Sequence, residues 1–401
     1  MKLSTYFLAA LFTIAAFLPV QAQIAVKGGI VYTMAGDAIE NGVILIRDGK
    51  IEAVGSEDSV TIPDGYEVHE SAVVTPGLID ARTVVGLAGI YNVAHDQDQL
   101  ERSNAFQPEL RAIDAFNARE DLVKWLRGHG ITTIHTGHGP GAVASGQTMI
   151  AKTAGNTVDA ALVDSVWAVA FTLGPSVGSN FSSPGTRSKA VSIFRSELIR
   201  GQEYLNRQEN GDSGSRDLKG EIMAKVVSGQ IKAMVTARSV TEIMTALRIA
   251  REFDIDLVLD GASEAYEVID EIAEAGVPVI IHPPMIRASG ENQNVRFDHA
   301  ALLHEAGIPF AFQSGFEGYV PKTRVVLFEA AVAVANGLPF EAGLAALTIN
   351  AAELLGISDR VGSIEPGKDA DLALFTGDPF EYVSQVCKVF VNGELVSDEC
   401  Y

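Results

Sequence analysis

The sequence predicts an α/β protein, built as a closed (β/α)₈, TIM-like barrel with a small β-sandwich domain assembled from both termini. Two observations lead to this fold class. The middle of the 401-residue chain alternates short apolar runs with longer amphipathic stretches. Roughly eight such runs over about 290 residues fit a (β/α)₈ barrel. Both ends of the chain instead show short alternating segments separated by turn residues, which is typical of strands.

Residues 1–22 are predicted to be a cleavable signal peptide and not part of the fold. Met1-Lys2 gives a short basic start and residues 6–20 form an apolar run. Val20-Gln21-Ala22 then places small residues where a signal peptidase reads. We expect cleavage after Ala22 and a periplasmic or secreted protein. No later stretch reaches the ~18 apolar residues of a spanning helix, so no membrane span is expected in the mature chain.

Residues 24–73 and 366–398 are predicted to form the composite β-sandwich. Asp48-Gly49 and Asn392-Gly393 each separate two apolar runs, which is a strong signal for a hairpin. In the second hairpin, over residues 386–396, Cys387 lies opposite Asp398, with Cys400 as a diagonal neighbour at about 7–8 Å. The sequence therefore leaves open whether these two cysteines form a disulfide, which an oxidising compartment would favour.

Residues 74–365 are predicted to form the barrel. The amphipathic stretches between its strands include residues 118–127, 240–253, 263–275 and 298–306. An open doubly wound sheet is the alternative, but no Gly-x-Gly-x-x-Gly follows an early strand. The expected strands lie at residues 73–79, 131–135, 148–152, 166–172, 231–236, 257–260, 277–282 and 308–312.

The charge balance excludes two classes of partner. The chain has 51 acidic and 30 basic residues, for a formal net charge of -21. Nucleic-acid binding needs a basic surface that displaces counterions, and attraction to an anionic membrane surface needs the same. We therefore expect no nucleic-acid partner and no docking on an anionic membrane.

Several short motifs occur in one order along nearly the whole mature chain. They are Asp48-Gly49-Lys50-Ile51, residues 74–81 (VTPGLIDA), residues 348–352 (TINAA), Gly362-Ser363-Ile364, residues 367–372 (GKDADL) and Val391-Asn392-Gly393. Together they resemble the amidohydrolase superfamily, in its secreted imidazolonepropionase-like or prolidase-like branch. The resemblance implies a hydrolase of carbon–nitrogen bonds in cyclic amides or dipeptide-like substrates, in which Zn²⁺ or another divalent metal activates a water.

The metal ligands that the resemblance implies do not map onto this chain. The family has His-x-His after the first barrel strand, where this chain has Arg82-Thr83-Val84. A later strand that should end in His offers Thr236 or Arg238, the next offers Gly261, and Gly315 stands where the final Asp is expected. Since Zn²⁺ needs three or four N, O or S ligands, we expect a metal-site-deficient, catalytically impaired member. No cofactor is predicted from the residues, although the family would imply Zn²⁺ or another divalent metal.

The catalytic residues stay unknown, and five side chains are candidates for the barrel mouth: Arg82, Asp260, His135, His282 and Gln313. All five fall at the carboxyl ends of predicted strands, where barrels carry their sites. The alternative left open is an active hydrolase with a relocated site around His135 and His282, joined by His138, Asp260 or Glu317. Against it stands the reading that these histidines are hydrogen-bonded loop residues. His69, His95, His299 and His304 are expected at the surface.

Arg82 also indicates which kind of ligand the barrel mouth would bind. A bidentate guanidinium at a concave mouth suits a carboxylate or phosphate, so we expect a small anionic ligand, with Arg238 as a second candidate cation. The alternative is that Arg82 pairs with Asp260 and closes the pocket. A protein kept without catalysis is expected to act as a binding protein, as a homo-oligomer, or as a hetero-oligomer with an active paralogue.

Overall fold

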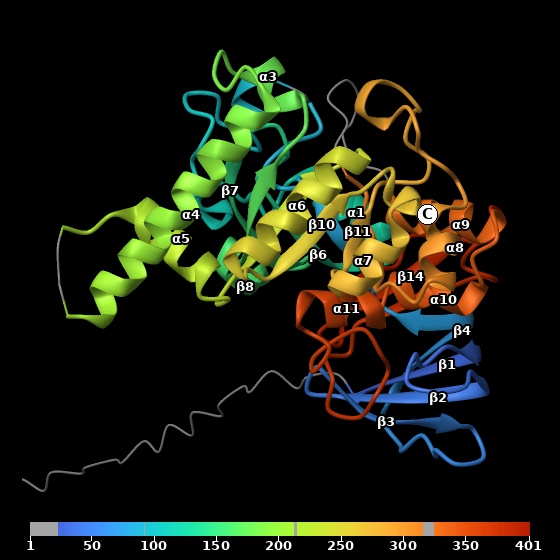
Figure 1. The fold of residues 1–401 in the computed structure, drawn as a ribbon. Coiled ribbons are helices and arrows are strands. Elements are labelled where there is room, and N and C mark those ends of the chain that lie inside the picture. Colours follow the sequence, from blue (N-terminus) through green and yellow to red (C-terminus); the bar gives the residue numbers. More distant parts are fainter. Residues whose placement is uncertain (1–22, 92, 212–214, 316–324) are drawn as a thin grey trace, which may run out of the picture.

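The computed structural model describes residues 23–91, 93–211, 215–315 and 325–401. The predicted signal peptide lies outside these described residues, and so does Glu317. Within them the strands form one sheet of eight strands and one of seven. Figure 1 shows the helices around the eight-stranded sheet, with the blue strands of the other sheet below it. This is the predicted TIM-like barrel with a separate sheet domain built from both termini.

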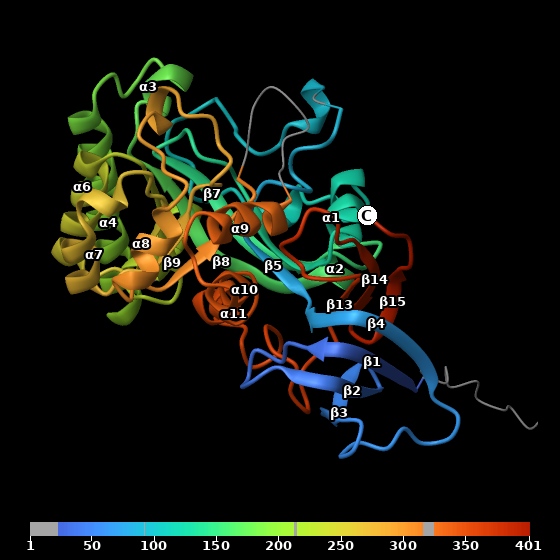
Figure 2. The same ribbon diagram turned by 90° about the vertical axis from the view of Figure 1, so that its right-hand side faces the viewer.

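The seven-stranded sheet joins the two ends of the chain. Its order is β15-β14-β13-β4-β1-β2-β3, and the two halves meet where β4 pairs antiparallel with β13, with Leu372 opposite Pro76. Figure 2 shows β13, β14 and β15 beside β4. The strands are β1 (Ile24–Val31), β2 (Ile39–Arg47), β3 (Lys50–Ser56), β4 (Glu67–Pro76), β13 (Leu372–Phe375), β14 (Val386–Val391) and β15 (Glu394–Ser397).

The eight-stranded sheet closes into a barrel. Its order runs from β12 to β5, and the two end strands meet where Thr83 bridges Gly315. There the Gly315 N–H donates to the Arg82 carbonyl at 3.2 Å. The strands are β5 (Leu78–Thr83), β6 (Ile131–Gly137), β7 (Ala144–Lys152), β8 (Leu162–Thr172), β9 (Lys232–Ala237), β10 (Leu257–Gly261), β11 (Val279–Ile281) and β12 (Phe310–Phe312).

One barrel strand runs against the expected direction. β7 pairs antiparallel with both β6 and β8, whereas the other neighbouring pairs are parallel. Residues 138–143 alone connect β6 to β7, and a parallel crossover needs a dozen or more residues. The short connection therefore turns the chain back on itself as a hairpin.

The helices lie mainly outside the barrel (Figure 1). The sequence predicts α6 at its observed bounds, because Ile243, Ala246 and Leu247 recur at helical spacing and are buried. None of the helices within the described residues is both long and apolar enough to span a membrane. They are α1 (Asp121–Gly128), α2 (Val158–Ala161), α3 (Ser176–Asn180), α4 (Arg187–Glu209), α5 (Leu218–Val227), α6 (Val240–Phe253), α7 (Ile269–Ala275), α8 (His299–Glu305), α9 (Val326–Ala335), α10 (Phe340–Ala346) and α11 (Ile349–Leu355), with 3₁₀ turns η1 (Ala94–Asp96), η2 (Ala112–Asp114), η3 (Ala265–Glu267) and η4 (Gly290–Asn292).

The barrel interior is filled and one end is closed. Ile79, Met234 and Val258 are fully buried and belong to one apolar cluster that also includes residues of α11. The Trp167 indole N–H donates to the Leu355 carbonyl at 2.9 Å, which ties the barrel wall to the end of α11. The Ile79 N–H, near the amino end of β5, donates to the Leu347 carbonyl just before α11 begins. This end of the barrel is therefore covered, and the open end is the one at the carboxyl ends of the parallel strands.

A buried ion cluster joins the barrel to the seven-stranded sheet. The Lys152 ammonium lies 2.5 Å from an Asp371 carboxylate oxygen and 3.2 Å from an oxygen of Asp369. All three side chains are at most 4% exposed. Because β7 is antiparallel, its last residue reaches the base of the barrel, where the segment that leads into β13 passes.

Cys387 and Cys400 form a disulfide, with their Cα atoms 3.9 Å apart. The hairpin keeps the predicted pairing at its turn, where Val391 lies opposite Glu394, but a bulge places Val389 opposite Ser397. A further shift then pairs Val386 with Tyr401 through two backbone hydrogen bonds. These shifts bring the two cysteines opposite each other instead of diagonal.

Candidate functional site

Four of the five predicted mouth residues line one cavity at the open end of the barrel. Arg82 lies in β5 and Asp260 in β10, while His282 and Gln313 directly follow β11 and β12. The cavity has a volume of about 40 Å³, which is room for a water-sized group. Its walls also include Arg238, Gly261 and Gly315.

Arg82 is a buried cation at the end of β5. Its side chain is 3% exposed, and it donates to the carbonyl of Thr83 at 2.9 Å and to the carbonyl of His138. Burial lowers the pKa of Arg82, while the nearby charges of Asp260 and Asp80 act to raise it. The guanidinium stays protonated and has no lone pair to offer a metal.

Asp260 is held in place by two neutral donors. The Thr236 hydroxyl donates to one of its carboxylate oxygens at 2.5 Å, and the Gln313 amide donates to the other at 2.7 Å. Gln313 also donates to the Ile280 carbonyl at 3.1 Å. Gln313 therefore orients the Asp260 carboxylate, whose charge acts on Arg82.

Asp80 is a buried carboxyl that the sequence reasoning missed. One of its oxygens accepts the backbone N–H groups of Arg82, at 3.2 Å, and Ser314, at 3.0 Å. Burial raises the pKa of Asp80 to about 7, against the lowering effect of the Ser314 and Arg82 hydrogen bonds. An acidic residue inside the apolar run Leu78-Ile79-Asp80-Ala81 was the signal that could have identified it.

His282 faces the cavity as a neutral imidazole. Its Nδ1 lies 2.9 Å from the Pro283 carbonyl, and its Nε2 lies 3.2 Å from Nδ1 of His299. Burial lowers the pKa of His282 to about 4, and the charge of Arg238 acts in the same direction. At neutral pH the ring is therefore uncharged.

Two histidines that were expected at the surface are buried. His299 is 1% exposed, and its ring stacks on His282 with 5.1 Å between ring centroids. His69 is 6% exposed and lies edge-on to Phe390, at 5.2 Å. In both cases packing against an element distant in sequence buries the ring, which the local pattern does not reveal.

His135 lies inside the barrel and not at its mouth. It is fully buried, and its two ring nitrogens lie 2.6 Å from the Ala81 carbonyl and 2.8 Å from the Thr148 hydroxyl. Its ring also packs against Trp167, at 4.3 Å. Burial lowers the pKa of His135 to about 3, helped by the charge of Arg82. The structure therefore does not place His135 on the cavity wall beside His282.

Arg238 forms a half-buried ion pair with Glu291. Its guanidinium lies 2.7 Å from a carboxylate oxygen of Glu291, a residue of η4 in the long connection between β11 and α8. The other oxygen of Glu291 accepts the backbone N–H of Ser176 at 2.5 Å. The second candidate cation of the mouth thus has an internal carboxylate partner.

The residues at this mouth do not fit the metal centre that the family resemblance implies. Among the described residues that line the cavity, only Asp260 and His282 are of a metal-ligating type. Gly261 and Gly315 contribute no side chain. No group of three or more His, Cys, Asp or Glu suited to a metal occurs among the described residues of the chain.

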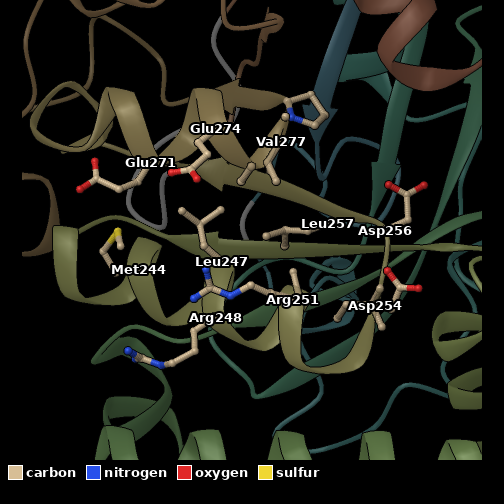
Figure 3. A pocket seen from close by; sticks show the side chains of 15 residues that line it. Met244, Leu247, Arg248, Arg251, Asp254, Asp256, Leu257, Glu271, Glu274 and Val277 are labelled. Carbon is tan, nitrogen blue, oxygen red and sulfur yellow. The ribbon is translucent and has the colours of Figure 1, made fainter.

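A second concave surface lies on the outside of the barrel, between α6 and α7. Figure 3 shows Arg248 and Arg251 on one side of this groove and Glu271 and Glu274 on the other. Its volume is about 470 Å³, and it reaches the residues that precede β10 and β11. It therefore lies near the amino ends of these strands, away from the mouth.

Comparison with known families agrees with this architecture. The model of the Amidohydrolase family matches residues 296–396. A solved structure of an amidohydrolase from Thermotoga maritima MSB8 superposes with a TM-score of 0.88 and is 27% identical, covering 94% of this chain and 100% of that one. The chain belongs to the amidohydrolase superfamily. These matches support a hydrolase of carbon–nitrogen bonds, which is the activity class that the resemblance in the sequence implied.

Two curated relatives extend the similarity over most of this amidohydrolase. An imidazolonepropionase from Thermoplasma volcanium is 25% identical over 389 residues, covering 90% of this chain and 92% of that protein. The amidohydrolase tasK from Hapsidospora irregularis is 22% identical over 396 residues. That match covers 90% of this chain but spans only 40% of the length of tasK.

Proposed function

We propose that this amidohydrolase is a metal-site-deficient, catalytically impaired member of its superfamily, and that it binds a small anionic ligand at the barrel mouth. Arg82 carries the proposal. It is a buried guanidinium at the carboxyl end of the first barrel strand, where the family has its His-x-His. Two carbonyls hold this cation in place, so it is a fixed part of the mouth.

Electrostatics supports the proposal. A dication about 5 Å from this guanidinium would be repelled by several kcal/mol at an effective dielectric constant of about 20. Asp260 and Asp80 offset part of the positive charge. Both oxygens of Asp260 already accept hydrogen bonds, as does one oxygen of Asp80; within the described residues the other oxygen of Asp80 is buried without a hydrogen-bond partner. An anion is attracted by the same field that repels a metal.

An active hydrolase with a relocated site is the second candidate. Its support is that His282 is a neutral imidazole on the cavity wall, and a neutral imidazole is the form that can act as a base. Its weakness is that both ring nitrogens of His135, in the barrel interior, already have partners, and so do both ring nitrogens of His282. This candidate would therefore depend on His282 without His135.

We further propose a periplasmic or secreted protein that works as a homo-oligomer, or as a hetero-oligomer with an active paralogue. The predicted signal peptide supports the location. The disulfide between Cys387 and Cys400 supports an oxidising compartment.

Metal analysis of the purified mature protein tests the proposal. The protein is stripped with a chelator, exposed to Zn²⁺ or Mn²⁺, desalted and assayed for bound metal. We expect far less than one metal per chain. Stoichiometric metal that a chelator removes, together with hydrolysis of a cyclic amide or dipeptide substrate that depends on it, would overturn the proposal. Metal-independent hydrolysis lost in a His282→Ala variant would favour the relocated site.

A further inference from the structure

We propose that Arg238 and the backbone after β8 form a receptor for the carboxylate group of a small molecule, and that Glu291 occupies this receptor as an internal substitute. This inference rests on the proposed function, because it names the anion class and the atoms that bind it. It also adds a displaceable latch, which is residues 283–298, the connection between β11 and α8.

The geometry around Glu291 is that of a bound carboxylate. One oxygen takes the charge-assisted bond from Arg238 at 2.7 Å, and the other accepts the Ser176 N–H at 2.5 Å. A Cβ built on Gly174 would lie 3.3 Å from the carboxylate, so the bare backbone there leaves room for the group. Figure 2 shows the latch passing α3, the helix that begins at Ser176.

The receptor offers more donors than Glu291 uses. Within the described residues the Ser176 hydroxyl oxygen is buried and has no hydrogen-bond partner. A free ligand is not tethered to the latch and can therefore approach this hydroxyl as well as the N–H. The donor set is a guanidinium, an amide N–H and a hydroxyl, which suits an oxyanion.

Charge explains why an anion should replace Glu291. Within the described residues, Arg238 has Glu291 as its ion-pair partner. If the latch moved away with nothing in its place, a half-buried cation would lose its counter-charge while Arg82 remains on the same cavity wall. A ligand carboxylate restores the balance, whereas a neutral molecule does not.

The latch is otherwise held by separate hydrogen bonds. The Met285 N–H donates to Glu329 at 2.7 Å, the Ser263 hydroxyl donates to Asn292 at 3.1 Å, and Asn294 donates to Glu264 at 2.6 Å. None of these three contacts is an ion pair. Glu291 is thus the contact through which a ligand can compete with the latch.

Replacing Glu291 tests this inference in the full mature chain. The probes are propionate, which reproduces the glutamate side chain, and propionamide, its neutral counterpart, titrated by saturation-transfer NMR. An internal competitor that keeps the receptor occupied roughly 90–99% of the time weakens apparent affinity by about 10–100-fold. We therefore expect Glu291→Ala to bind propionate at least tenfold more tightly than the parent, with no gain for propionamide.

Three further variants make the result decisive. Asp298→Ala is the matched control, because it removes a carboxylate at the end of the same connection that pairs with Arg296 at 2.6 Å; it should behave as the parent. Adding Arg238→Met to Glu291→Ala should abolish the gain. Glu291→Gln keeps the side-chain size if the alanine variant folds poorly, as judged by circular dichroism.

The outcomes separate this inference from the proposed function. All titrations are run in chelator, so propionate binding is measured without metal, while metal uptake is measured independently. Equal propionate affinity in the parent and both Glu291 variants would overturn the latch, and so would a gain that survives loss of Arg238. Stoichiometric metal uptake would overturn the proposed function and leave the propionate result standing.

Discussion

Replacing Lys152 by Met should strongly destabilise the protein. The ammonium of Lys152 lies 2.5 Å from Asp371 and 3.2 Å from Asp369, in surroundings where each side chain is at most 4% exposed. Without it, Asp371 keeps only a backbone N–H, from Asn392 at 2.9 Å, among its described contacts. Breaking a buried pair so that one charge stays uncompensated costs about 3–5 kcal/mol.

The damage should be concentrated on Asp371. Asp369 also contacts Lys50 at 2.6 Å and Arg360 at 2.9 Å, so it keeps cations when Lys152 is removed. The expected loss in free energy of unfolding is therefore that of one buried carboxylate and not of two. Urea denaturation followed by circular dichroism measures it.

Two control variants distinguish the loss of a buried counter-charge from other effects of removing a lysine. Lys50→Met removes a half-exposed cation from Asp369 and should cost at most about 1 kcal/mol. In the double variant of Lys152→Met with Asp371→Asn, the buried charges disappear together, and the new amide oxygen can still accept the Asn392 N–H. This variant should recover most of the loss. A cost below about 1 kcal/mol for Lys152→Met, or no recovery in the double variant, would refute the reasoning.

Three further predictions follow from other parts of the fold. Replacing Cys387 and Cys400 by Ala should lower stability by about 3 kcal/mol for a loop with a sequence separation of 13, and reduction of the parent should give the same loss in urea titrations. Burial raises the pKa of Asp80 to about 7, so the contribution of Asp80 to stability is full below the pKa of the unfolded chain and is lost as pH rises through 7. The stability of the parent should therefore fall between pH 5 and 8, and Asp80→Asn should remove roughly 2–3 kcal/mol of that fall. Gly315→Asp should cost about 1–2 kcal/mol or more in thermal melts, since φ is +66° there and the new Cβ would lie 3.0 Å from Pro283.

The sequence predicts the fold well because its signals are local and repeated. Strand runs and helical spacing identify the barrel, and turn dipeptides identify the β segments at both ends. The direction of β7 escapes this reasoning, because it depends on the short connection of residues 138–143 and not on the strand itself. The disulfide escapes it too, because the bulge between Val389 and Phe390 changes the register that places Cys400.

The candidate site is predictable only in part. Arg82, Asp260, His282 and Gln313 meet because the carboxyl ends of parallel barrel strands gather at one end. The sequence pattern does not show how deep in the barrel a side chain lies. Inward side chains of one strand occupy successive layers, and His135 lies below the mouth, in contact with Trp167. Contacts made by long connections, such as the pair formed by Glu291, have no local signal at all.

The backbone of the mouth bears on the proposed lack of a metal centre as much as the side chains do. Gly261 and Gly315 have φ values of +83° and +66°, a left-handed conformation that costs a residue with a Cβ about 1–2 kcal/mol. His at position 261 and Asp at position 315 would therefore have to form in strained backbone. Replacing Arg82 and Val84 by His would restore two of the family's ligands, while Gly261 and Gly315 would still offer no side chain to a metal. Regaining the family's metal site thus needs the chain to move at two strand ends, which supports reading this mouth as rebuilt around a fixed cation.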